Sequence, residues 1–146
     1  MSAQKKEVAD QFGVSLMENI ICYEVVFLKT PELFELEYLF ECDAQLSEDG
    51  IPWQYTSVSF YVIRDKVKAE FDFEEASRSG QIRLYLYEEE LTKIILENIK
   101  DITIRKSNDF ESLVLEFDEE NYVKPLVLQT KPRINMTWGT SLELRR

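Results

Sequence analysis

The chain has 146 residues, of which 45% are hydrophobic and 31% charged, with only 4 glycines and 4 prolines. This length and composition indicate a single strand-rich domain over residues 1–146 with its own core, and exclude a disordered or collagen-like chain. The 17 Lys and Arg against 28 Asp and Glu give a net charge of −11, which argues against direct binding to nucleic acid or to an anionic membrane surface. No charge-free apolar run approaches the roughly 20 residues of a membrane-spanning helix.

The N-terminal region contains two predicted elements. Residues 3–12 are typical of a short amphipathic helix that Gly13 ends, and residues 18–28 are rich in β-branched and aromatic types, which favours a strand. The first residues carry no long apolar core of a secretory signal, so we expect a cytoplasmic protein. Cys22 and Cys42 match no metal or redox motif, and we expect buried free thiols.

Residues 34–46 alternate between apolar and mostly acidic side chains, which predicts a strand because successive side chains of a strand point to opposite faces. The apolar positions are Phe34, Leu36, Tyr38, Phe40, Cys42, Ala44 and Leu46. The opposite face carries four carboxylates, those of Glu35, Glu37, Glu41 and Asp43. This pattern predicts a buried Phe40 beside an exposed Glu41.

The next segments have strand periodicity. Residues 53–63 and 67–73 are separated by the short connection at 64–66, which predicts a β-hairpin. In residues 82–86, apolar side chains again occupy every second position, which predicts another strand. Residues 88–99 change period, because Leu91, Ile94, Ile95, Asn98 and Ile99 recur at helical spacing and three glutamates fill the first turn. We therefore expect a helix over 88–99.

Further strands are predicted at residues 101–106, 112–118, 122–129 and 140–145. The fold class is α+β: a mostly antiparallel β-sheet of about eight or nine strands, closed as a sandwich or partial barrel, with the helix near 88–99 on one face. Strands that follow one another through short turns favour this antiparallel arrangement.

The residue inventory restricts the chemistry of the chain. It contains no histidine, so a Ser-His-Asp or Cys-His catalytic arrangement is excluded. Two cysteines without histidine cannot form the usual zinc sites, and no phosphate-binding glycine motif is present. We predict no catalytic residues, no metal, no cofactor and no enzymatic activity.

The acidic charge is concentrated in the first third of the chain. Residues 1–50 carry 3 basic and 11 acidic side chains, and no basic residue occurs between Lys29 and Arg64. Complementary charge steers association and suppresses wrong partners. We therefore predict a non-enzymatic acidic binding protein that docks a basic protein partner through Glu35, Glu37, Glu41 and Asp43, as an inhibitor, an immunity-type protein or an assembly factor.

Three other interpretations remain open. The acidic residues can serve as a solubility surface. The chain can be a structural subunit of a larger assembly, including a homo-oligomer, that packs through sheet edges. A carboxylate-based hydrolase needs only two acids about 5–10 Å apart, a condition that many surface strands meet. An association rate that falls with salt separates the acidic inhibitor from an apolar subunit interface.

Overall fold

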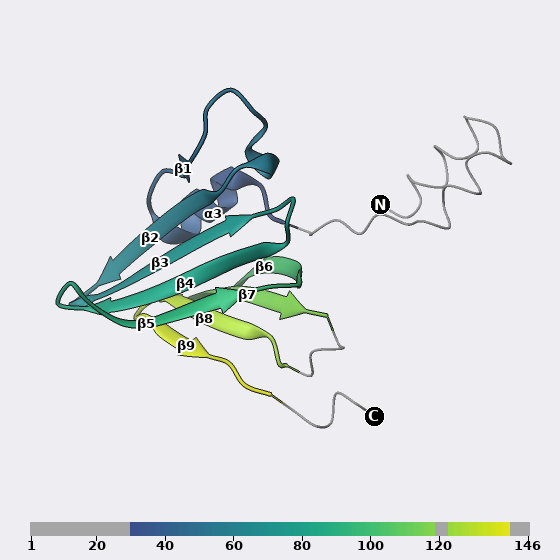
Figure 1. Ribbon diagram of the computed structural model, residues 1–146. Helices are drawn as coiled ribbons and strands as arrows, with labels where there is room; N and C mark the ends of the chain where they lie inside the picture. The colour runs from purple at the N-terminus through teal and green to yellow at the C-terminus, as the bar shows by residue number, and fades with distance from the viewer. Residues whose placement is uncertain (1–29, 119–122, 141–146) are drawn as a thin grey trace, which may run out of the picture.

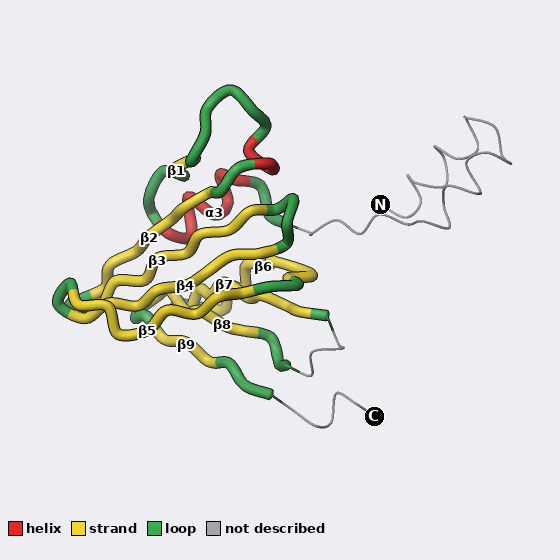
Figure 2. The backbone as a smooth tube through the Cα atoms, viewed as in Figure 1, coloured by secondary structure: helices red, strands yellow, loops and turns green. Residues whose placement is uncertain are grey.

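The computed structural model describes residues 30–118 and 123–140. Within these residues, the chain forms two antiparallel sheets of five and four strands and one α-helix (Figures 1 and 2). The five-stranded sheet has the order β1-β2-β3-β4-β5, and the four-stranded sheet has the order β6-β7-β8-β9. The predicted fold class, mostly antiparallel β with about nine strands and one helix, is confirmed, although the helix lies elsewhere in the chain.

Each sheet is a continuous meander, because neighbouring strands are also consecutive in the sequence. The first sheet comprises β1 (Gln45–Leu46), β2 (Val58–Arg64), β3 (Val67–Glu74), β4 (Ser79–Leu86) and β5 (Glu89–Leu96). The second comprises β6 (Ile99–Ser107), β7 (Phe110–Phe117), β8 (Leu126–Lys131) and β9 (Asn135–Thr137). The helix is α3 (Leu33–Phe40), and a 3-10 turn, η1, spans Trp53–Tyr55.

The predicted hairpin is confirmed for β2 and β3, where Phe60 is paired with Phe71. Its first residues are not a strand: Trp53–Tyr55 form η1, which follows Pro52. The Trp53 ring instead packs edge-on against Phe73, with ring centroids 6.2 Å apart. The predicted strands at 82–86, 101–106, 112–118 and 122–129 correspond to β4, β6, β7 and β8, with shifted bounds.

The strand predicted at 34–46 is wrong. Residues Leu33–Phe40 form α3, and only Gln45–Leu46 of this segment are a strand. Leu36, Leu39 and Phe40 recur at a spacing of three to four residues, which places them on one buried side of the helix. Glu41 ends the helix in a left-handed conformation with φ of 57°. Phe40 is buried and Glu41 exposed, as predicted, but a helix rather than a strand produces this difference.

The helix predicted at 88–99 is also wrong, because Glu89–Leu96 form β5. The two residues before it, Tyr87 and Glu88, have φ of 52° and 69°, which matches the tight two-residue turn of a hairpin. The pairing with β4 then shifts in register, which leaves Leu91 without a partner. This β-bulge interrupts the alternation of side chains, so the apolar residues acquire a spacing that resembles a helix.

One hydrophobic core joins the helix and the two sheets. Phe40 of α3 stacks on Phe60 and Phe71, with ring centroids 5.4 Å and 6.1 Å apart. The second sheet adds leucines from β7 and β8 to the same cluster, namely Leu113, Leu115, Leu126 and Leu128. The helix is therefore held against the sheets by its aromatic C-terminal end.

Three predicted features fall outside the described residues. These are the helix at 3–12, the strand at 18–28, and the last strand at 140–145 apart from Thr140, which bridges to Val123. No helix in residues 30–118 or 123–140 is long and apolar enough to cross a membrane.

Candidate protein-binding surface

The four carboxylates predicted to share a strand face lie along α3 and in the segment after it instead. Glu35 and Glu37 are on the helix, and Glu41 and Asp43 follow it. Glu35 accepts a hydrogen bond of 2.9 Å from the backbone N–H of Glu32, which caps the helix. Glu37 accepts one of 2.8 Å from the backbone N–H of Ala44. The predicted acidic row is wrong in its geometry, because these residues lie on a helix and the segment after it and not on one strand face. Two of its members also bind backbone groups nearby.

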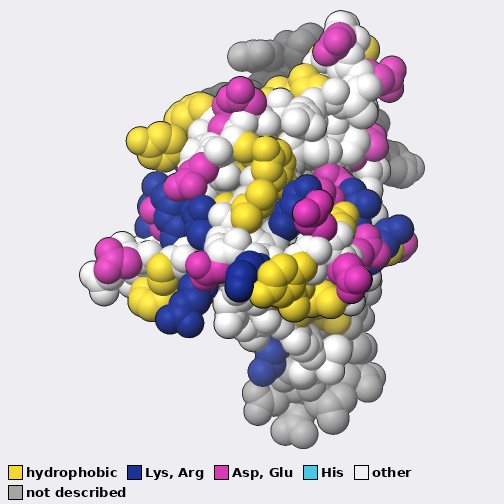
Figure 3. Space-filling view, turned by 90° about the vertical axis from the view of Figure 1, so that its left-hand side faces the viewer, with side chains coloured by type: hydrophobic (Ala, Val, Ile, Leu, Met, Phe, Trp, Pro, Cys, Tyr) yellow, Lys and Arg dark blue, Asp and Glu magenta, His cyan; other side chains and the backbone are white. Residues whose placement is uncertain are grey.

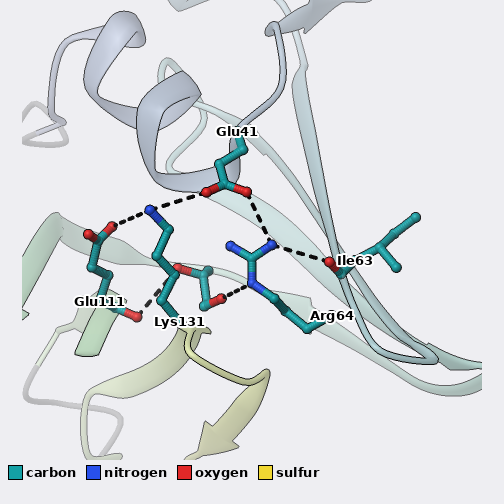
Figure 4. A network of polar contacts seen from close by, with 6 residues as sticks. Glu41, Ile63, Arg64, Glu111 and Lys131 are labelled. Carbon is teal, nitrogen blue, oxygen red and sulfur yellow. Dashed lines mark hydrogen bonds and ion pairs between the residues drawn. The ribbon is translucent and has the colours of Figure 1, made fainter. Parts of the chain in front are cut away.

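Glu41 is the centre of an ion-pair network (Figure 4). Its carboxylate lies 3.1 Å from Arg64 at the end of β2 and 3.2 Å from Lys131 at the end of β8. Lys131 also lies 3.5 Å from Glu111, and Arg64 donates a hydrogen bond of 2.9 Å to the carbonyl of Thr130. The network links the end of α3 to both sheets.

These contacts alter the ionisation of both partners. The hydrogen bond from Lys131, together with the neighbouring Arg64, lowers the pKa of Glu41 although burial opposes the change. The same hydrogen bond raises the pKa of Lys131. The negative charge of Glu41 is therefore balanced by Arg64 and Lys131 within the fold. The sequence around Glu41 contains no signal for these ion pairs, because both cations come from distant strands. The role of the four acids in partner binding stays a prediction.

The acidic residues still gather in one part of the molecule, residues 30–57, which we call the acidic lobe. It comprises α3, β1, η1 and their connections, and the loop between β1 and η1 projects beyond the body of the five-stranded sheet (Figures 1 and 2). Its carboxylates are Glu32, Glu35, Glu37, Glu41, Asp43, Glu48 and Asp49. The lobe contains no Lys or Arg, so only other parts of the molecule or a partner can neutralise it.

Two aromatic side chains of α3 are directed away from the core. Phe34 is 67% exposed and Tyr38 is 77% exposed, whereas Leu36, Leu39 and Phe40 are buried. Phe34 and Tyr38 are four residues apart and therefore neighbours on one side of the helix. We call this pair the aromatic face of α3. The strand prediction assigned both to the buried side with Phe40, and a helical reading of 33–40 would have found them.

The outer face of the five-stranded sheet has a different character, because its charges pair with one another. Glu70 lies 3.0 Å from Lys68 and 2.9 Å from Arg83, and the hydroxyl of Tyr85 donates to it at 3.0 Å. Burial would raise the pKa of Glu70, but the hydrogen bonds from Lys68 and Tyr85 and the positive charges of Lys68 and Arg83 together lower it. The ammonium of Lys68 also lies 5.1 Å from the centre of the Tyr61 ring.

Seen from the left-hand side of Figure 1, basic, acidic and hydrophobic side chains lie side by side (Figure 3). Neither charge sign dominates this view. The acidic lobe differs from such a mixed surface in composition, because its seven carboxylates are accompanied by no Lys or Arg of the lobe itself.

A shallow depression of about 400 Å³ lies at the β3–β4–β5 end of the sheet. Asp72, Gly80 and Glu97 are among its lining residues, and Asp72 accepts a hydrogen bond of 3.1 Å from Gln81. The residues that the structure describes contain no group of three His, Cys, Asp or Glu side chains placed to hold a metal ion. The depression thus offers carboxylates without a formed metal site.

No family model and no curated protein matches this sequence. The fold is similar to that of a chain from the contact-dependent growth inhibition toxin–immunity protein complex of Klebsiella pneumoniae 342, with a TM-score of 0.67 and 15% sequence identity. The match covers 80% of this chain and 100% of that chain. The similarity therefore extends over a whole chain that was solved as part of a two-protein complex.

Proposed function

We propose that this chain is an immunity-type binding protein, which docks a basic toxin domain and inhibits it without catalysing a reaction. The observation that carries the proposal is the fold match over 100% of a chain from a toxin–immunity complex. The toxin and the immunity protein of such a complex each bind another protein. Either assignment therefore supports a protein partner for this chain.

The residue inventory favours the inhibitor over the toxin. The sequence has no histidine, the commonest general base in enzymes, and carries a net charge of −11. An acidic surface accelerates association with a basic partner and repels acidic ones. The acidic lobe, with seven carboxylates and no basic residue, supplies such a surface. We propose the cytoplasm as the site of action, since inhibition there requires no export.

A structural subunit is the second candidate, and one observation favours it. Strand β5 is the last strand of its sheet in the described residues, and its side chains Leu91 and Ile95 are 62% and 58% exposed. A terminal strand offers unpaired backbone N–H and C=O groups to another strand, and exposed apolar side chains favour such an association. Such an interface would respond little to salt.

The deciding experiment begins with affinity purification from the source organism, followed by binding measurements on the purified partner. The inhibitor proposal expects a basic partner whose association rate falls by about ten-fold or more between roughly 50 mM and 300 mM salt. It also expects that co-expression of this chain restores growth of cells that produce the partner. A partner that is not toxic, with association insensitive to salt, would overturn the proposal in favour of the structural subunit.

A further inference from the structure

The aromatic face of α3 is exposed on a helix whose other side is fully packed. Phe34 and Tyr38 are 67% and 77% exposed, whereas Leu36 and Phe40 are 0% and 1% exposed. Large aromatic side chains are enriched in the centres of protein interfaces. Neither ring belongs to the hydrophobic core, so we expect that α3 folds without them.

One of the two rings already contacts a cation. The ammonium of Lys106, in β6, lies 5.6 Å from the centre of the Tyr38 ring. A cation within about 6 Å of an aromatic ring is attracted by the negative face of the ring. A ring has two faces, and the high exposure of Tyr38 shows that this lysine leaves most of the side chain open.

Apart from Lys106, which contacts Tyr38 from β6, the charged side chains of α3 and of the segments next to it in the acidic lobe are acidic. Glu35 and Glu37 are on the same helix, and the acidic lobe contains no Lys or Arg. Glu41 adds less negative charge here, because Arg64 and Lys131 lie 3.1 Å and 3.2 Å from its carboxylate. A ligand for this face must therefore combine positive charge with the ability to cover an apolar ring.

Arginine has both properties. Its planar guanidinium stacks on aromatic rings and donates two parallel hydrogen bonds to a carboxylate, whereas the ammonium of lysine is a strongly hydrated point charge. We propose that the aromatic face of α3 docks an arginine-bearing segment of the basic protein partner, with the guanidinium against Phe34 and Tyr38 and an N–H directed at Oε2 of Glu35, whose Oε1 accepts the hydrogen bond that caps the helix. This inference rests on the proposed function, because it names the surface that such a partner contacts.

The chain provides a matched control for the aromatic face. Tyr87, in the turn between β4 and β5, is 62% exposed, and the ammonium of Lys66 lies 5.1 Å from its ring centre. It therefore has the same ring, a similar exposure and the same kind of lysine contact as Tyr38, but lies outside the acidic lobe. Tyr87→Ala removes an equivalent side chain without changing α3.

The first experiment uses the full chain and a defined probe, the blocked tripeptide acetyl-Arg-Leu-Arg-amide, followed by NMR chemical shifts. We expect saturable shifts at Phe34 and Tyr38, a several-fold weaker affinity for acetyl-Lys-Leu-Lys-amide, and loss of the shifts in the Phe34→Ala/Tyr38→Ala variant. The Tyr87→Ala variant should respond like the wild type. Saturable shifts centred elsewhere, or equal affinity for the two peptides, would overturn the proposal.

The second experiment uses the purified protein partner. The Phe34→Ala/Tyr38→Ala variant should bind it at least about ten-fold more weakly, and Tyr87→Ala within about two-fold of the wild type. Equal binding by wild type and double variant would overturn the assigned surface and leave the proposed function standing. If no partner is inhibited while the arginine peptide binds α3, the proposed function fails and the arginine site stands.

Two controls address folding and self-association. Thermal unfolding should give the same midpoint for the double variant as for the wild type within about 2 °C, since both side chains are exposed. Sedimentation of the wild type at high concentration should show no association that the double variant loses. An association that depends on Phe34 and Tyr38 would mean that a second copy covers this face, and would overturn the proposal.

Discussion

The carboxylate of Glu41 lies 3.2 Å from the ammonium of Lys131, which joins the end of α3 to the last residue of β8. Arg64 contacts the same carboxylate from β2, so a single side chain links the helix to both sheets. Glu41 occupies the left-handed position that ends the helix, with φ of 57°. The helix therefore ends at the residue whose side-chain carboxylate contacts Arg64 of the first sheet and Lys131 of the second.

The Glu41→Gln variant should lower the free energy of unfolding by about 0.5–1 kcal/mol at neutral pH. The effect is small because the carboxylate is 49% exposed and water screens its ion pairs. The pKa of Glu41 is lowered from its ordinary value of 4.5, mainly by the hydrogen bond from Lys131. The stability that it contributes is therefore present above pH 4.5 and lost as the pH falls through the lower pKa of the folded state.

Urea unfolding of wild type and Glu41→Gln at pH 7 and at pH 3 measures this difference. The two proteins should differ at pH 7 and approach one another at pH 3. A difference that is equal at both pH values, or larger in acid, would contradict the role of the ionised carboxylate.

The Phe40→Ala variant should lower the free energy of unfolding by about 3–5 kcal/mol. Phe40 is 1% exposed and stacks on Phe60 and Phe71, so its removal leaves a cavity between α3 and the sheet. Tyr38→Ala on the same helix should change stability by no more than about 0.5 kcal/mol, because the side chain is 77% exposed. Denaturant titration measures both, and similar losses for the two variants would argue against the observed orientation of α3.

The Gly80→Ala variant should destabilise the protein by about 1–3 kcal/mol. A Cβ at Gly80 would clash with the backbone carbonyl oxygen of Asp72 and lie 3.1 Å from the Cβ of Phe73. Gly139→Ala is the control, since a Cβ there meets nothing within 4 Å. Thermal unfolding should show a lower midpoint for Gly80→Ala alone, and an unchanged midpoint would contradict the close pairing of β3 and β4.

Local sequence patterns predicted the sheets better than the helix. Strands β2 and β3 alternate regularly between buried and outward side chains, so their hairpin was identified from the sequence. The β-bulge at Leu91 disturbs the same alternation in β5, so the pattern of this segment predicts a helix where the structure has a strand. In α3, Phe34 and Tyr38 share the parity of the buried Leu36 and Phe40 but are exposed. Apolar residues on both sides of the short helix thus produced a false strand pattern.

The candidate surface was predicted only in part. The absence of basic residues between Lys29 and Arg64 is visible in the sequence, and it marks the acidic lobe. The neutralisation of Glu41 depends on cations from β2 and β8, which only the folded chain brings together. A charge reversal at Glu41 would therefore place a cation beside Arg64 and Lys131. Such a variant would test stability as well as binding, and other acids of the lobe are better targets.

The Asp43→Lys/Asp49→Lys variant should slow association with the basic partner by about ten-fold at low salt, because these carboxylates belong to the lobe that steers the encounter. Both residues are exposed, and neither has an ion pair among the described residues. Glu88→Lys/Glu89→Lys changes the net charge equally at the start of β5 and should slow association less.

Stopped-flow measurements test whether the acidic lobe steers the encounter. They give the association rates of wild type and both variants at about 50 mM and about 300 mM salt. The difference between the two variants should shrink at the higher salt, because screening removes long-range steering first. Equal slowing in both variants would show that net charge, rather than the lobe, directs the encounter. Unchanged rates in both would identify the acidic residues as a solubility surface, since a steering role requires that charge reversal alter the rate.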